Sequence, residues 1–147
     1  MFSSQFLNKV LVALVSIFSM SCSVAEECKK EVFVCSSTEP ELVALKLCAG
    51  INDFHLAELV TEGYSFDASS QPDAFIKSSY HRAMVDEHSV EFKLDNIKVI
   101  VSDYHSEELD DVTGELSVTL LEGEKKRYFE CDADSFSHLP DYANTTQ

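Results

Sequence analysis

The densest group of chemically active side chains lies in the stretch SDYHSEELDD, which runs from Ser102 to Asp111. Its seven candidate site residues are Asp103, Tyr104, His105, Glu107, Glu108, Asp110 and Asp111. Carboxylates crowded into one segment repel one another, and this repulsion lowers folding stability at low ionic strength. Because charge runs are commonly solvated, one interpretation is a loop between two strands with no role of its own.

A second interpretation is that the same stretch binds a basic protein. A tyrosine offers a rigid contact area, and surrounding acids accelerate the approach of a cationic partner. On this hypothesis Tyr104 anchors the contact. A calcium loop is a third interpretation, but the spacing of the acids differs from that of an EF-hand and the stretch lacks a central glycine. The sequence therefore predicts a protein contact, with no metal and no cofactor.

Another candidate is the stretch SYHRAMVDEH, from Ser79 to His88, in which tyrosine, histidine and arginine precede two acids. The favoured interpretation is structural. Tyr80 and Met84 are expected to pack into the core, and the charged side chains are expected to face solvent.

The other residues form no recognisable catalytic arrangement. No two of the five histidines are four residues apart on a helix, and none has a zinc-type spacing with cysteine; they are His55, His81, His88, His105 and His138. There is no Gly-x-Ser-x-Gly motif and no phosphate-binding glycine loop, and the chain has only four glycines. We predict a protein that is not an enzyme.

The first 25 residues resemble a secretory signal peptide. Lys9 precedes the apolar run Val10–Met20, which is shorter than the ~20 residues of a membrane-spanning helix. Small residues before Glu26 predict cleavage at that point, and hence a soluble periplasmic protein. The alternative is a lipid anchor on Cys22, although Ser19 occupies the position where such signals have an apolar residue.

Without Cys22 the chain retains an even number of cysteines, which in an exported protein predicts two disulfides. The four are Cys28, Cys35, Cys48 and Cys131. If the flanking strands form a hairpin centred on Thr38, facing residues have numbers that sum to 76, and Cys28 faces Cys48. Cys28 and Cys35 are too far apart along one strand to be bonded. The second predicted disulfide is therefore Cys35–Cys131.

The chain is strongly acidic, with 26 acidic and 11 basic residues and a formal charge of −15. Such a surface repels nucleic acid and anionic membranes and attracts cationic proteins. A basic secreted protein such as a muramidase is the expected partner. The alternative is that the charge serves only solubility.

The fold class is predicted to be mainly β, an antiparallel β-sandwich or small barrel, because apolar and polar residues alternate between turn signals. One domain over residues 26–131 is expected, followed by a loosely ordered tail over residues 132–147. An unprotected edge strand would permit a homodimer. The expected strands are Glu31–Cys35, Glu41–Ala49, Ser89–Leu94, Ile97–Val101, Glu115–Leu121 and Lys126–Cys131.

Two stretches leave alternatives open. His55–Phe66 is either one bent strand broken at Gly63 or a short helix followed by a strand. Asp73–Val85 is either a helix or, in its second half, a strand, and the strand is favoured because its neighbours are all β.

The motifs VFVC, LKLCAG, GYSF and YFEC resemble, in this order, those of small periplasmic proteins of Gram-negative bacteria, in which glycine stands at the position of Asp67. In size, export, disulfides and β content the chain is also similar to periplasmic lysozyme inhibitors and to immunity proteins against cell-wall hydrolases. That resemblance implies inhibition of a basic peptidoglycan hydrolase by a loop inserted into its cleft, although the Ser-Gly-x-x-Tyr inhibitory motif is absent. The alternative is an envelope structural or small-ligand-binding module.

Overall fold

The computed structural model describes residues 28–51 and 53–142. The predicted signal peptide and the predicted lipid anchor at Cys22 lie outside these residues. Within the described part of the chain, no helix combines the length and the apolar character that crossing a bilayer requires.

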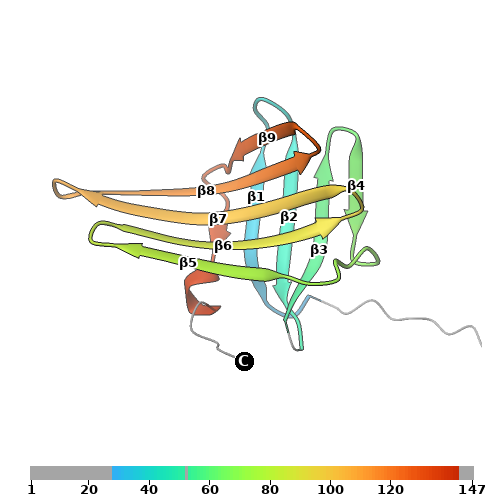
Figure 1. Ribbon diagram of the computed structural model, residues 1–147, viewed down its shortest axis with the longest axis horizontal. Coiled ribbons are helices and arrows are strands. Elements are labelled where there is room, and N and C mark those ends of the chain that lie inside the picture. Colours follow the sequence, from blue (N-terminus) through green and yellow to red (C-terminus); the bar gives the residue numbers. More distant parts are fainter. Residues whose placement is uncertain (1–27, 52, 143–147) are drawn as a thin grey trace, which may run out of the picture.

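The described residues form two antiparallel sheets of five strands each, with the strand orders β10-β1-β2-β3-β4 and β5-β6-β7-β8-β9 (Figure 1). The first sheet consists of β1 (Glu31–Ser37), β2 (Val43–Ala49), β3 (Phe54–Thr61), β4 (Tyr64–Asp67) and β10 (Phe136–Ser137). The second consists of β5 (Ile76–Arg82), β6 (Val85–Leu94), β7 (Ile97–Glu108), β8 (Asp111–Glu122) and β9 (Lys125–Glu130). A 3-10 turn, η1 (Leu139–Tyr142), follows β10. The prediction of an antiparallel, mainly β fold is confirmed.

The core lies between the two sheets, because alternate residues of each strand point toward the other sheet. Phe33 and Leu45 of the first sheet and Phe92, Val99 and Phe129 of the second belong to one buried apolar cluster. The strands of the second sheet run across those of the first, and β5 to β8 extend well past them on one side (Figure 1). The extended part of the second sheet therefore lacks a covering sheet.

Tight turns join neighbouring strands where the sequence signals them. Asp95 and Gly123 have positive φ angles of 52° and 59°, so the predicted turns between β6 and β7 and between β8 and β9 are present. The strand expected over His55–Phe66 is broken at Gly63 as the first alternative has it, but its two halves, β3 and β4, pair as a hairpin. The strand favoured over Tyr80–Val85 is present only in part, because β5 covers Ile76–Arg82 and the chain turns at Ala83 and Met84 before β6 begins.

Both predicted disulfides, Cys28–Cys48 and Cys35–Cys131, are present. The register assumed for the first of them is wrong, because Cys35 faces Leu45 and the numbers of that pair sum to 80. The hairpin is centred on Pro40 instead of Thr38, because β1 continues to Ser37 and β2 begins at Val43, and the pairing also shifts between Glu31 and Phe33. Cys28 reaches Cys48 from just outside β1.

Residues 132–142 do not form the expected loosely ordered tail. β10 pairs with β1, the amide of Asp132 donates to the carbonyl of Ser36, and Leu139 is buried in the core. Leu139 is the apolar residue that makes this segment pack. Residues 143–147 lie outside the described part of the chain.

Polar contacts join the sheets at the end opposite to the extension. The Tyr64 hydroxyl donates to Glu122, and Arg127 contacts Glu41 at 3.3 Å and lies 5.6 Å from the Tyr64 ring centroid. The hydrogen bond to Glu122 raises the pKa of Tyr64 above its ordinary value of 10.0, because phenolate formation would break this bond beside a carboxylate. The hydrogen bond between Tyr64 and Glu122 therefore stabilises the folded protein below pH 10.0 and is lost as the phenol ionises at higher pH.

Tyr64→Phe is expected to lower the free energy of unfolding at neutral pH, and the difference from wild type should shrink as the pH rises above 10.0. Urea unfolding at a series of pH values measures it, with Tyr80→Phe as the matched tyrosine control. A difference that grows with alkaline pH would contradict the assignment.

The two disulfides should differ in their contribution to stability. Cys35–Cys131 joins residues 96 positions apart and Cys28–Cys48 joins residues 20 apart. In the chain-entropy model these loops contribute about 4.7 and about 3.3 kcal/mol. Replacing both cysteines of each pair with alanine and measuring urea unfolding should show the larger loss for Cys35–Cys131, and the opposite order would contradict the model.

Candidate functional site

The acidic stretch Ser102–Asp111 is not the expected loop. β7 continues to Glu108, a two-residue turn follows at Leu109 and Asp110, and β8 begins at Asp111. The strand can carry so many acids because successive side chains point to opposite faces of the sheet, which separates neighbouring charges. The stretch therefore forms the end of a long, rigid hairpin.

The seven predicted site residues are consequently divided among three places. Alternation from the buried Val101 places Asp103, His105 and Glu107 on the inner face, which continues the core face. Tyr104 and Glu108 lie on the outer face. Asp110 and Asp111 lie at the turn. Asp103 is 2% exposed, so it is not available to a partner protein.

The turn carries an exposed apolar residue among acids. Leu109 is 98% exposed and Val112 is 67% exposed. We call the segment from Glu107 to Val112 the acidic tip. No lysine or arginine occurs between Lys98 and Lys125. The acidic residues of that interval are Asp103, Glu107, Glu108, Asp110, Asp111, Glu115, Glu122 and Glu124.

The turn between β5 and β6 lies beside the acidic tip (Figure 1). The amide of Glu107 donates to the carbonyl of Met84 at 2.8 Å, which fixes one turn against the base of the other. Met84 is 59% exposed and Tyr80 is 48% exposed, so the expectation that both pack into the core is wrong. Met84 and Tyr80 lie beyond the edge of the first sheet, where no strand of that sheet covers them.

The buried side chain in Ser79–His88 is a histidine. His88 is 5% exposed and faces inward in line with Val90. In the register of β6 and β7, His88 is opposite Asp103 and Asp86 is opposite His105. On the inner face, histidine and aspartate therefore alternate both along each strand and across the pair of strands. β5 extends the pattern, with Ser79 opposite His88 and His81 opposite Asp86.

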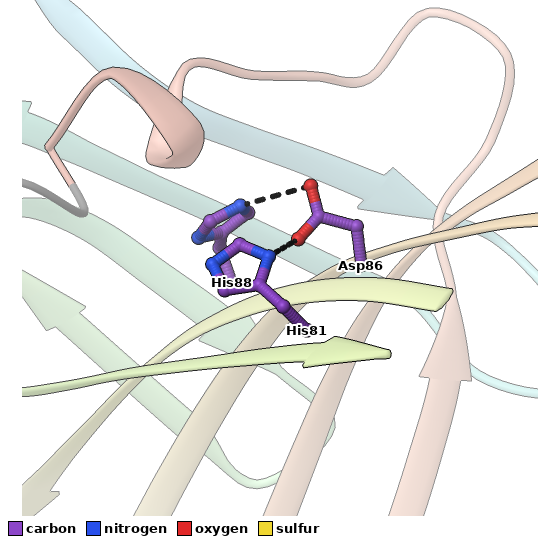
Figure 2. Close-up of side chains that lie close together, drawn as sticks. All are labelled: His81, Asp86 and His88. Carbon is purple, nitrogen blue, oxygen red and sulfur yellow. Dashed lines mark hydrogen bonds and ion pairs between the residues drawn. The ribbon is translucent and has the colours of Figure 1, made fainter. Parts of the chain in front are cut away.

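The carboxylate of Asp86 faces two imidazole rings, those of His81 and His88, which lie next to each other on one side of it (Figure 2). His81 Nδ1 contacts Asp86 Oδ1, and His88 Nε2 is 3.4 Å from Asp86 Oδ2. The other ring nitrogen of His88, Nδ1, is 3.0 Å from the Ser79 hydroxyl. Asp86 Oδ1 is buried, and the His81 ring is its partner.

A second histidine–aspartate pair lies beside the cluster formed by His81, Asp86 and His88. His105 Nε2 is 2.7 Å from Asp103 Oδ1, a separation typical of a charge-assisted contact. The His105 ring lies over Gly114, where an added Cβ would be 3.0 Å from Nδ1 and 3.1 Å from Cε1. Glycine at position 114 therefore makes room for the ring that covers the buried Asp103.

A surface hollow of about 420 Å³ opens beside these groups. Its lining includes His81, Asp86 and His105 from the inner face and Arg82, Met84 and Val112 from the two turns. His88 lies deeper and borders a small cavity with Leu139 and Tyr142. The histidine cluster is thus reached from solvent through the hollow and closed from below by η1.

The sequence contained a signal for this cluster. Within β6 and β7 the motif Asp-x-His occurs twice, at Asp86–His88 and at Asp103–His105, and a third copy, Asp53–His55, lies at the start of β3. In a strand, residues two apart share a face, so each motif places an acid and an imidazole side by side. Sequence reasoning missed the pair because it assigned the second motif to a loop and searched for histidines at helical spacing.

No protein-family model matches the chain, and no curated protein or solved structure matches it.

Gly114→Ala tests the packing of the His105 ring. At an unhindered strand position this change stabilises a protein by about 0.5–1 kcal/mol. Here it should destabilise, because the added Cβ displaces the ring from Asp103. In a His105→Ala background the same change should be neutral or stabilising, since the obstructing ring is gone. Urea unfolding of the four proteins measures this, and stabilisation in both backgrounds would contradict the ring placement.

Proposed function

We propose that this protein is a non-catalytic periplasmic binding protein that neutralises a cationic protein, and that the acidic tip makes the central contact. The observation that carries the proposal is the almost complete exposure of Leu109 at the end of a projecting hairpin, with acids on both sides. Covering a leucine side chain contributes about 1.5–3 kcal/mol, which an isolated protein forgoes at this position.

The backbone at the tip supports the same proposal. Leu109 and Asp110 have φ angles of 52° and 67°, in the left-handed region where asparagine and glycine are favoured. A leucine there is costly for the turn and adds nothing to the core. A contact with a partner gives this side chain a role.

The acids determine what kind of partner fits. Glu107, Glu108, Asp110 and Asp111 are all exposed, and the interval between Lys98 and Lys125 holds no positive side chain apart from histidine. A cationic surface is attracted over a distance of about a Debye length, ~8–10 Å at physiological salt. A hairpin is narrow and stiff enough to enter a cleft, so we propose a basic peptidoglycan hydrolase of the muramidase type as the partner.

The structure changes the roles assigned within the predicted site. We assign the anchor to Leu109, because Tyr104 lies back from the tip on the outer face. Asp103 and His105 are excluded from the contact because they pair with each other on the inner face. The proposed contact set is the acidic tip together with Met84.

Removing the charge of the tip should slow association. The variant Glu107→Gln, Glu108→Gln, Asp110→Asn, Asp111→Asn keeps side-chain size and is expected to associate with a basic muramidase about 10-fold more slowly at low salt, with a weaker dependence on ionic strength. Surface plasmon resonance at several salt concentrations measures both quantities.

A matched variant removes four charges elsewhere, Glu58→Gln, Glu62→Gln, Asp132→Asn and Asp134→Asn. It should retain most of the association rate. Equal loss in the two variants would mean that only net charge matters, and unchanged binding by the tip variant would refute the assignment of the tip.

Leu109→Asn separates contact from folding. Asparagine tolerates a left-handed backbone, so the hairpin should be as stable as before or more stable. Dissociation from the muramidase should be about 10- to 100-fold faster, the equivalent of the lost burial. Ile51→Asn, at a residue 88% exposed, is the control and should leave dissociation unchanged. If Leu109→Asn also leaves it unchanged, Leu109 is not the anchor.

A further inference from the structure

We propose that His81, Asp86 and His88 bind one Zn²⁺ ion on the inner face of the extended sheet. None of these three residues belongs to the proposed protein contact, and the zinc proposal does not depend on that contact. Two imidazole nitrogens and one carboxylate oxygen, all within 4.8 Å of one another, supply the three ligand atoms. This is the donor set of zinc sites that keep one position open.

The distances permit coordination with small movements. Zinc lies about 2.0–2.2 Å from its ligands, so ligand atoms around a tetrahedral ion are about 3.3 Å apart. Ligand atoms that lie farther apart than this must approach by at most about 1.5 Å, and the closer contact between His81 and Asp86 must lengthen. The His81 side chain is 65% exposed and free to make that movement, whereas His88 and Asp86 are held in β6.

The surroundings of His88 resemble the support that metal ligands have in proteins. Its Nδ1 is 3.0 Å from the Ser79 hydroxyl, so Nδ1–H can donate to that oxygen and leave the Nε2 lone pair directed toward Asp86. A hydrogen bond of this kind fixes the tautomer and the orientation of a ligating histidine. Because the Ser79 hydroxyl is both donor and acceptor, it satisfies Nδ1 with or without the ion.

The Asp86 carboxylate faces both imidazole rings. Its buried Oδ1 contacts His81 Nδ1, and its Oδ2 is 3.4 Å from His88 Nε2. A zinc ion among these atoms would replace the contacts with coordination bonds to the same three side chains.

The donor set selects the class of ion. Calcium and magnesium prefer shells made of oxygen, whereas imidazole suits zinc and its neighbours in the transition series. The hollow of about 420 Å³ borders His81 and Asp86, so solvent or an anionic group reaches the open position. Arg82 lines the same hollow and favours an anion there.

Isothermal titration of the untagged, oxidised and chelator-treated protein with ZnCl₂ tests the site. Wild type is expected to bind one equivalent of zinc saturably. His81→Ala should abolish saturable binding over the same concentration range, Asp86→Asn should weaken it, and Ser79→Ala should weaken it by about 10-fold. His138→Ala is the control, because this histidine is half exposed and lies 3.7 Å from an aspartate, yet is not one of the three proposed ligands.

A second measurement locates the ion. Histidine side-chain NMR should show zinc-dependent shifts of Nε2 of His88 and of the His81 ring, and none at His138. Circular dichroism verifies that each variant is folded, and His81→Gln replaces His81→Ala if the latter is not. Leu109→Asn should bind zinc as wild type does, because Leu109 does not line the hollow, and this separates the zinc proposal from the proposed function.

Two results would overturn the zinc site. One is the absence of saturable zinc binding by folded wild-type protein. The other is equal binding by wild type and by folded variants at position 81, which would place the ion elsewhere.

Discussion

The uninterrupted pairing of β6 with β7 is the constraint on which the rest of the structure depends. Ten residue pairs run from Leu94–Ile97 at the core end to Val85–Ser106 at the far end without a register shift. A single slip would move every inward side chain to the outer face. The same register therefore fixes the apolar core, the alternating histidines and aspartates, and the position of the two turns.

Along this ladder the inner face changes character where the first sheet ends. Val90, Phe92 and Val101 are covered and belong to the core. His88 and Asp103 come next and are still buried, and His105 and Glu107 beyond them are exposed. The exposure of the side chains therefore increases in steps along this face. The groups proposed to bind an ion or a protein lie in the same order.

The covered end is held more firmly than the projecting end. Cys35–Cys131 joins the first sheet to the end of β9, and Tyr64 and Arg127 add contacts between the sheets. The far half of the second sheet is held by its ladder hydrogen bonds, by the histidine–aspartate contacts and by the contact between the two turns. Such a division gives the hairpin a rigid base, as the proposed contact with a partner requires.

Much of the fold could be predicted from the sequence, because period-two alternation and turn residues are local signals. The strand type and the turns at Asp95 and Gly123 were predictable in this way. Both disulfides were also predicted, although the hairpin register used to pair Cys28 with Cys48 is wrong. The end of β7 was not, since an acidic run suggests a loop and only pairing with β8 keeps it extended. The cluster of His81, Asp86 and His88 depends on register between strands, which a single sequence does not specify.

The most direct test of the account is to map amide chemical shifts of the ¹⁵N-labelled protein as a basic muramidase is added. The account predicts shifts concentrated at Glu107–Val112 and at Met84, with β1 to β4 unaffected. Shifts centred on the first sheet, or no shifts at a muramidase concentration that binds the protein at low salt, would contradict it.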